Sequence, residues 1–230
     1  MGIQSMAGSR KDAMKLHWSP SAPFVRKVMV CAHALGLADR IELVRSRVGP
    51  ARLNDDLMAD NPLNKIPTLI TDTGERLYDS RVICEYLDAL AGGGAIFPSE
   101  SGARWRALTW QSLADGMVDA AILRRDEEFR GEGHRSPAHR LAYAAKMRAA
   151  LDRMEADAPL LEHAGLTIGA IAVGVALSYL DFRPPGENWR ERCPALAAWE
   201  ADFARQPAML AAPFADEGAG PKKFALYTME

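Results

Sequence analysis

The stretch "SPSAPFVRKV", Ser19 to Val28, passes from a turn of small residues and prolines directly into a helical pattern. Pro23 suits the first position of a helix, because the N–H that it lacks would have no partner inside the helix. The N–H groups that follow, together with the positive end of the helix dipole, favour an anion above the turn. A thiolate is such an anion. The alternative is an ordinary strand-to-helix connection that binds no ligand. The turn by itself is compatible with an anion site and with such a connection.

Strands and helices alternate on both sides of this turn. Strand patterns are expected at 14–18 and 41–45, helices at 23–37, 54–61 and 80–90, and a hairpin of "IPTLIT" and "ERLY" around "DTG" at 72–74. The resulting order, β-α-β-α-β-β-α, predicts an α/β unit of layered sheet and helices.

The second half of the chain carries only helical patterns. "AGGGAIFPSE" (91–100) reads as a linker because of its three glycines and its proline. Helices are expected at 103–128, 137–162, 167–180 and 194–205. The helix at 167–180 is apolar on nearly every face, which is typical of a helix inside a bundle. The predicted organisation is a disordered leader (1–13), an α/β domain (14–92), a linker (93–101), an all-helical domain (102–215) and a tail (216–230).

The composition restricts the partners of the chain. Its 230 residues are 48% hydrophobic and carry a formal net charge of −2, so a sizeable core is expected and a basic surface is not. Nucleic acid and anionic membrane are therefore poor candidates for a partner. The first thirteen residues lack the apolar segment of a signal peptide, and Met14 is a plausible alternative start. Cys31, Cys84 and Cys193 match no disulfide framework and no zinc pattern, which favours a reducing cytoplasm and no metal.

Two further features of the first half could bear a site. In "NKIPTL" (64–69), a proline stands just before a strand, and a cis bond there would leave the Ile66 backbone free to pair with an extended peptide. In "YDSRVICEYL" (78–87), Asp79 and Ser80 stand at the start of a helix. Both types are good helix caps, and both could instead hold a ligand: Asp79 an amine, and Ser80 with the helix N-terminus a carboxylate.

Taken together, these features resemble the cytosolic glutathione S-transferase superfamily. The resemblance covers almost everything from Met14 to about Pro213. It rests on the order and spacing of "SPSAPFVRKV", "NPLNKIPTLI", "LYDSRVICEYLD", and "TIGAIAVGVALSYLDFR" followed by "CPALAAWEADFARQPAM". The chain looks most like bacterial members whose first turn reads Ser-Pro-x-Ser-Pro-Tyr/Phe-Val-Arg-Lys. The resemblance implies a thioredoxin-like N-terminal domain, an all-α C-terminal domain, and a homodimer.

The resemblance also implies a glutathione site with glutathione as co-substrate. Ile66, beside a cis Pro67, would pair its backbone with the glutathione cysteine, and Lys65 would reach the glycine carboxylate. Asp79 and Ser80 would hold the γ-glutamyl end, with Phe24 of the first turn also on the glutathione side. A small electrophile would sit between that turn and the first long C-terminal helix. The residues that would line its pocket are Trp105, Trp110, Leu113, Met117 and Arg124, although ordinary packing explains each of them equally well.

The chain departs from the family pattern at Ala22, where the relatives carry a serine or a cysteine facing the glutathione sulfur. A free thiol has a pKa near 8.5, and only the thiolate is nucleophilic. One hydrogen bond to a charged group contributes roughly 1.5–3 kcal/mol, so a missing hydroxyl could remove much of the pKa shift. Ser21, Ser19 or backbone N–H groups alone could substitute. The leading interpretation is a glutathione transferase. The alternatives are a glutathione-dependent isomerase or peroxidase, and a non-catalytic protein that binds glutathione or a protein partner.

Overall fold

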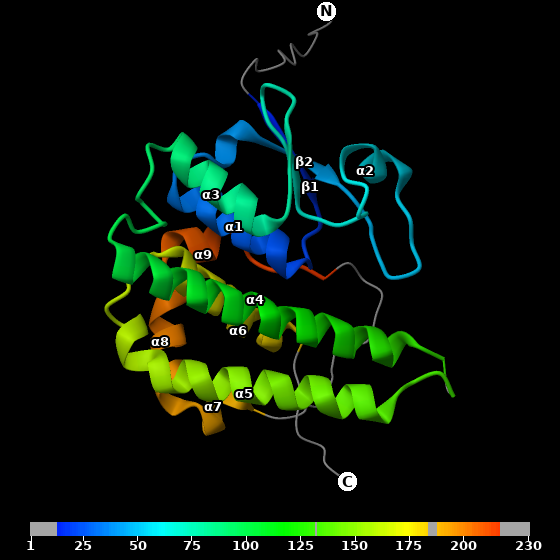
Figure 1. Cartoon of the computed structure of the whole chain (residues 1–230), viewed down its shortest axis with the longest axis vertical. Helices are drawn as coiled ribbons and strands as arrows, with labels where there is room; N and C mark the ends of the chain where they lie inside the picture. The colour runs from blue at the N-terminus through cyan, green and yellow to red at the C-terminus, as the bar shows by residue number, and fades with distance from the viewer. Residues whose placement is uncertain (1–12, 132, 184–187, 217–230) are drawn as a thin grey trace, which may run out of the picture.

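The structure is a computed structural model, and it describes residues 13–131, 133–183 and 188–216 of the chain. The predicted leader and tail lie outside these residues, apart from Ala13 and Asp216. An α/β part comes first and a helical part follows, and the two are packed against each other (Figure 1). This architecture confirms the predicted fold class.

A four-stranded mixed sheet forms the centre of the first part. Its strands are β1 (Met14–Trp18), β2 (Ile41–Arg45), β3 (Thr68–Ile70) and β4 (Arg76–Leu77), in the order β2-β1-β3-β4. β1 is parallel to β2, whereas β1–β3 and β3–β4 are antiparallel. The predicted hairpin at 72–74 is present, closed by the Thr71 N–H donating to the Glu75 carbonyl at 2.9 Å.

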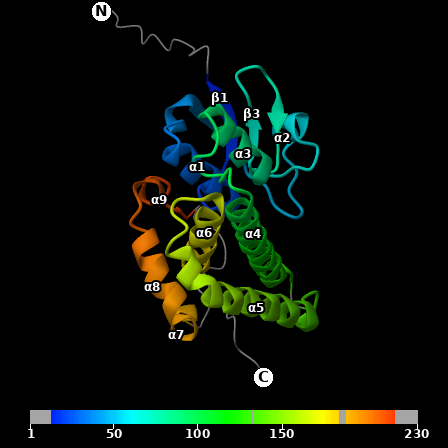
Figure 2. The ribbon, with the colours of Figure 1, turned by 60° about the vertical axis from the view of Figure 1, so that its left-hand side comes forward.

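Three helices flank the sheet. α1 (Pro23–Ala34) and α3 (Ser80–Leu90) pack against each other, and α2 (Asp55–Asp60) lies on the other side of the strands (Figure 2). α1 ends three residues before the predicted end at Leu37. Leu35 is its C-cap, and Gly36 follows with φ 68°, a left-handed conformation that glycine adopts without steric cost. A short 3-10 helix, η1 (Ala38–Arg40), was not expected from the sequence.

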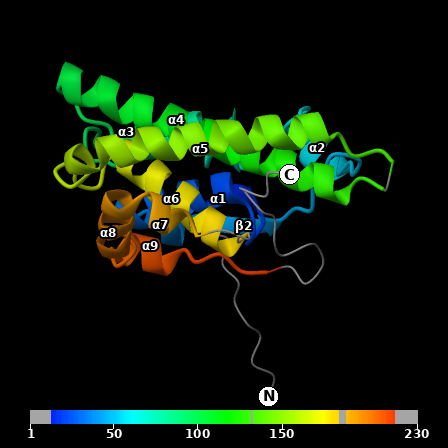
Figure 3. The ribbon, with the colours of Figure 1, turned by 90° about the horizontal axis from the view of Figure 1, so that it is seen from below.

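The described residues of the second part form only helices. Four are longer, α4 (Ser101–Phe129), α5 (Pro137–Leu161), α6 (Ile168–Phe182) and α8 (Pro194–Phe203), and two are short, α7 (Trp189–Arg192) and α9 (Pro207–Ala211). α4 and α5 lie side by side along most of their length, with α6 beneath them (Figure 3). The four long helices are the predicted ones, with ends that differ by a few residues. α7 and α9 were not predicted, because four or five residues are too few to show helical periodicity.

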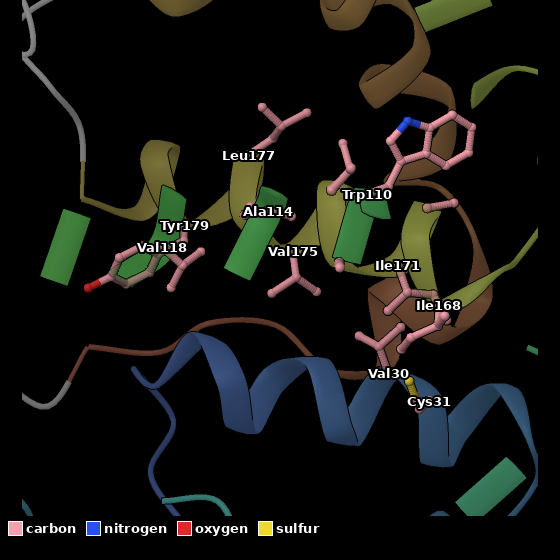
Figure 4. Close-up of a cluster of buried hydrophobic side chains, with 14 of the residues drawn as sticks. Val30, Cys31, Trp110, Ala114, Val118, Ile168, Ile171, Val175, Leu177 and Tyr179 are labelled. Carbon is pink, nitrogen blue, oxygen red and sulfur yellow. The ribbon is translucent and has the colours of Figure 1, made fainter. Parts of the chain in front are cut away.

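α6 is the buried helix of the bundle, as its apolar sequence predicts. It packs against α1 of the first part and against α4, and Figure 4 shows Val30 and Cys31 of α1 facing Ile168 and Ile171 of α6. Gly169 allows α4 to approach closely, since a Cβ there would lie 2.6 Å from the Ala107 carbonyl oxygen. The hydrophobic core therefore runs continuously from the sheet side of α1 into the helical part.

Candidate functional site

The N-terminus of α1 begins at a residue that cannot cap it with a side chain. Ala22 occupies the N-cap position with an extended backbone (φ −90°, ψ 117°), and its methyl group can accept no hydrogen bond from the first turn. The Ala22 carbonyl accepts from the Arg26 N–H at 3.0 Å, so the helix starts here. Among the residues that the structure describes, no side chain caps this helix, so N–H groups of its first turn are available to water or to a ligand.

Two serines lie beside this helix tip. Ser19 is buried and Ser21 is partly exposed, and their hydroxyl oxygens are 3.4 Å apart. The Ser19 carbonyl accepts from the Ala22 N–H at 3.3 Å, which closes the turn between β1 and α1. Both hydroxyls thus stay within three residues of the N-cap, and either one is near enough in sequence to serve a thiol above the tip.

The segment before β3 presents its backbone at the same end of the sheet. The Ile66–Pro67 peptide bond is cis, as the sequence analysis required for this role. The Asn61 side chain donates to the Lys65 carbonyl at 3.2 Å and to the Thr68 hydroxyl at 2.9 Å, which fixes the loop on either side of the bond. Within the described part of the chain, the Ile66 backbone makes no hydrogen bond. Its N–H and carbonyl are therefore available to an extended ligand.

The N-terminus of α3 has the side-chain cap that α1 lacks. Asp79 is the N-cap, and its Oδ1 accepts from the Arg81 N–H at 2.8 Å. Asp79 is exposed and Ser80 is 3% exposed. The Tyr78–Asp79 peptide bond is also cis, which the sequence analysis did not anticipate. Capping uses only one carboxylate oxygen, so the capping role and a ligand role for Asp79 are compatible.

Strand pairing brings these three segments together. Thr68 of β3 pairs with His17 of β1, and Leu77 of β4 pairs with Leu69 of β3. Because β3 is antiparallel to both neighbours, the end of β1 at Trp18, the start of β3 at Thr68 and the end of β4 at Leu77 lie at the same edge of the sheet. The α1 tip, the Ile66 backbone and the α3 tip therefore lie at one end of the sheet.

Charged residues surround the α3 tip. Lys65, in the loop before β3, and Asp119, on α4, are both exposed, and the charge of Lys65 acts on the Asp119 carboxyl. Partial desolvation and the neighbouring Asp115 carboxylate raise the pKa of Asp119, while Lys65 and Arg81 act in the opposite direction. The sequence predicts Lys65 at this site, but no motif marks Arg81, Asp115 or Asp119. Asp115 and Asp119 are four residues apart on α4, a spacing that marks one face of a helix.

The segment after α9 crosses the first turn of α1. The Arg26 guanidinium donates through Nε to the Ala212 carbonyl at 2.6 Å and through Nη2 to the Met209 carbonyl at 3.3 Å, and it lies 4.6 Å from the centre of the Phe214 ring. Burial lowers the pKa of Arg26 to about 10. The Ala215 N–H donates to the Pro20 carbonyl at 3.1 Å, so this segment is attached directly to the turn before α1.

Aromatic side chains continue from this segment towards α4. The Phe214 ring stacks on Phe182 at 4.9 Å between centroids and tilts against Tyr179 at 5.7 Å. The Tyr179 hydroxyl lies 3.5 Å from Nη1 of Arg125 on α4. Tyr179 stands at the far end of the buried cluster from Cys31 (Figure 4). No sequence motif marks these residues, because their contact joins segments far apart in the chain.

The structure does not gather the five residues expected to line a second-substrate pocket. Trp110 and Met117 are buried in the core, and the Trp110 indole donates to Asp157 of α5 at 3.0 Å. Arg124 is buried as well, where desolvation and the nearby Arg140 lower its pKa. These three side chains are buried in the packing of α4, and their place in a second-substrate pocket stays a prediction. Sequence reasoning chose them by residue type and not by helix face.

Trp105 is exposed on α4, whereas Leu113 is partly buried and packs against the core. With Leu108, Thr109 and Ser112 they line a shallow hollow of about 460 Å³. Trp105 is 64% exposed, which is unusual for so large an apolar side chain. This hollow belongs to α4 alone and contains no residue of the turn before α1, so it is a surface distinct from the site at the end of the sheet.

The described residues contain neither an evident metal site nor a helix that could span a membrane. Within them, no cluster of three or more histidine, cysteine or acidic side chains is arranged to hold a metal ion. None of the helices in that same part of the chain is long and apolar enough to cross a membrane. The three cysteines are buried thiols, and burial together with the neighbouring Cys84 raises the pKa of Cys31 well above its ordinary value.

The chain thus combines an α/β unit, which has a cis-proline loop between two helix N-termini, with a helical bundle. Two known domain families match these two parts. Residues 21–90 match the glutathione S-transferase N-terminal domain, and residues 134–202 match the glutathione S-transferase C-terminal domain. The chain belongs to the glutathione S-transferase family.

Individual relatives agree with this assignment. The chain is 41% identical to a glutathione transferase family member from Pseudomonas fluorescens Pf-5, whose crystal structure has bound glutathione. That match covers 89% of this chain and 100% of the other, with a TM-score of 0.85. A glutathione S-transferase from Methylobacillus flagellatus KT with glutathione bound is 32% identical, over 88% of this chain and 100% of the other, with a TM-score of 0.79. The GST-like protein YibF of Escherichia coli K12 is 30% identical over 76% of this chain and 86% of its own length.

Proposed function

We propose that the chain is a glutathione transferase that conjugates the glutathione thiolate to a small electrophile. The observation that carries this proposal is the convergence of the α1 tip, the Ile66 backbone and the α3 tip at one end of the sheet. In the proposed complex, Ile66 pairs its backbone with the glutathione cysteine, beside cis Pro67. Asp79 and Ser80 hold the γ-glutamyl end, and Lys65 reaches the glycine carboxylate. The two relatives crystallised with glutathione support the proposal that this chain binds glutathione.

The thiol lies above the α1 tip in this proposal, beside Ser19, Ser21 and Phe24. The helix dipole and the N–H groups of the first turn stabilise the thiolate. Ionised thiol then attacks the electrophile, and the leaving group departs with its electron pair. Arg125 and Phe214 are partly exposed and are linked through the buried Tyr179, and Phe214 lies against Arg26 near this turn, so we propose Arg125 and Phe214 as contributors to the electrophile side.

Two measurements test the function. Calorimetry should detect glutathione binding to the wild-type chain, and a generic aryl halide should yield conjugate in the presence of glutathione. Ala22→Ser should raise turnover at neutral pH and change it little at high pH, where the thiol ionises without help. Binding without turnover in the wild type, and turnover only in Ala22→Ser, would leave the transferase proposal for the wild type without support.

A second candidate function follows from Ala22 itself. A family member without the hydroxyl could bind glutathione, or a protein partner through the same surface, without catalysing conjugation. A glutathione-dependent isomerase or peroxidase would use the same thiolate on another electrophile. Retention of Lys65, Pro67, Asp79 and Ser80 favours a glutathione-dependent enzyme over a protein that has lost the cofactor site.

We also propose that the chain is a cytoplasmic homodimer that uses the exposed face of α4. The hollow lined by Trp105 and Leu113 would be covered by a second copy related by a two-fold axis. Light scattering at micromolar concentration should report about twice the chain mass of 25.1 kDa. Trp105→Glu places a charge in that face and should shift the mass towards a single chain. A wild-type mass near 25 kDa would contradict the dimer.

A further inference from the structure

Three charged side chains join the two parts of the molecule beneath the candidate site. The Lys27 ammonium of α1 lies 2.7 Å from both carboxylate oxygens of Asp115 on α4. Nε of Arg81 on α3 lies 3.0 Å from Oδ2 of the same carboxylate. Lys27 is 1% exposed and Asp115 is 4% exposed, whereas half of the Arg81 side chain reaches solvent.

The pair of Lys27 and Asp115 is costly in this position. Removing an ammonium and a carboxylate from water carries a large desolvation penalty, which their attraction offsets only with good geometry. An apolar pair of similar volume is often at least as stable as such an ion pair. Lys27 is surrounded on α1 by the buried residues Val25, Val28 and Cys31, so an apolar side chain would suit its neighbours. Fold stability alone therefore gives little reason for a lysine here.

The location of the pair suggests its use. Lys27 is four residues after Pro23, one turn below the tip where the thiol is proposed to lie. Arg81 follows Asp79 and Ser80, and its N–H is the one that the Asp79 carboxylate accepts. Asp115 is thus attached through one carboxylate to both helices whose N-termini make up the site.

We infer that Lys27 is a positioning residue, which holds Asp115 so that Arg81 fixes the α3 tip relative to the α1 tip. This inference rests on the proposed function. Correct separation of the two tips lets one glutathione molecule place its glutamyl end at Asp79 and its thiol above Ala22 at the same time. Without Lys27, the Asp115 carboxylate lies buried with Arg81 as its remaining cation and moves towards solvent with it. Misplacement by about 1 Å can cost as much as a hundredfold in rate, so a small shift suffices.

The test separates this role from simple stabilisation. Lys27→Met should lower the midpoint of thermal unfolding, because it leaves a buried carboxylate with one partner fewer. The double variant Lys27→Met/Asp115→Leu should recover that midpoint, since both charges are gone. We expect the double variant to bind glutathione about tenfold more weakly than the wild type, and to raise the apparent pKa of the bound thiol. Trp110→Phe, which removes a buried hydrogen bond elsewhere on α4, is the matched control and should retain wild-type affinity.

Arg81→Met provides a second variant. The Arg81 side chain is half exposed, so we expect this variant to fold. It cuts the link from Asp115 to α3 and leaves the pair with Lys27 in place. It should weaken glutathione binding about tenfold and lower the unfolding midpoint less than Lys27→Met does, because Asp115 keeps its buried partner Lys27, and Arg81→Lys should restore part of the loss in affinity. If the double variant or the Arg81→Met variant kept wild-type affinity and wild-type thiol pKa, the inference about Lys27 would be wrong, while the proposed function would still stand. A wild-type chain that does not bind glutathione would overturn the proposed function, and the inference with it.

Discussion

The N-termini of α1 and α3 point to the same end of the sheet, and they are built differently. α3 begins with Asp79, whose carboxylate caps the first turn at 2.8 Å, and continues with the buried Ser80. α1 begins with Ala22, which offers no acceptor, and only Ser19 and Ser21 of the preceding turn supply hydroxyls. Each N-terminus presents its own backbone N–H groups and the positive end of its own helix dipole. The two therefore differ mainly in the chemistry of their side chains.

This difference separates recognition from activation. Holding a charged glutamyl end needs fixed polar partners, and the α3 tip has them. Ionising a thiol needs only a stabilised anion, to which backbone N–H groups and a dipole already contribute. We therefore expect that the chain recognises glutathione as its relatives do and ionises its thiol less fully than a family member with a hydroxyl at this position.

The largest effect is expected at the α3 tip. Asp79→Ala removes both the proposed partner of the glutamyl ammonium and the helix cap, and should weaken glutathione binding at least tenfold, about 1.4 kcal/mol or more. Calorimetry measures the affinity. Asp79→Asn is the matched control, because asparagine caps a helix as well as aspartate but carries no charge. Equal affinities for the wild type and both variants would remove Asp79 from the site.

The next effect concerns the stability of α1. Ala22→Ser supplies the missing cap and should increase the free energy of unfolding by about 1 kcal/mol. Urea unfolding monitored by circular dichroism measures the change. Ala22→Gly should give nearly the same gain without a hydroxyl, since glycine is only a few tenths of a kcal/mol poorer than serine as a cap. No gain from either variant would mean that Ser19 or Ser21 already satisfies the first turn.

The smallest effect is expected in the turn before α1. Ser21→Ala should lower turnover with an aryl halide at neutral pH by about twofold, because a net hydrogen bond of roughly 0.5 kcal/mol is lost at a residue next to the N-cap. Steady-state kinetics at neutral and high pH measure it, with Ser19→Ala beside it. A loss of a hundredfold in Ser21→Ala would mean that Ser21 has taken over the role of the missing hydroxyl.

The parts of the site that the sequence predicts are local ones. Pro23, Pro67 and the Asp79–Ser80 pair each act within a few residues of the chain, and turn and cap chemistry places them. The sheet and the long helices follow likewise from alternation, periodicity and glycine or proline punctuation.

Long-range contacts are the parts that the sequence does not predict. Lys27 and Asp115 are 88 residues apart, and nothing in either helix pattern names the other as a partner. Arg26 binds carbonyls more than 180 residues away, in a segment without a motif. The burial of the residues of α4 that we expected to line a pocket was unpredictable for a related reason. A helix of 29 residues exposes several faces, and only its neighbours decide whether Trp110 is core or Trp105 is surface.

The bound thiol's pKa tests most directly whether the α1 tip ionises glutathione weakly. Ultraviolet absorbance of the thiolate, followed against pH at saturating glutathione, gives this pKa for the wild type, Ala22→Ser and Ala22→Gly. We expect the wild-type pKa to lie within about one unit of the free-thiol value near 8.5. Ala22→Ser should lower it by about one further unit, or roughly 1.4 kcal/mol of thiolate stabilisation, while Ala22→Gly leaves it unchanged. A wild-type pKa already depressed by two units or more, and unmoved by Ala22→Ser, would show that backbone N–H groups suffice and would contradict the importance given to the missing hydroxyl.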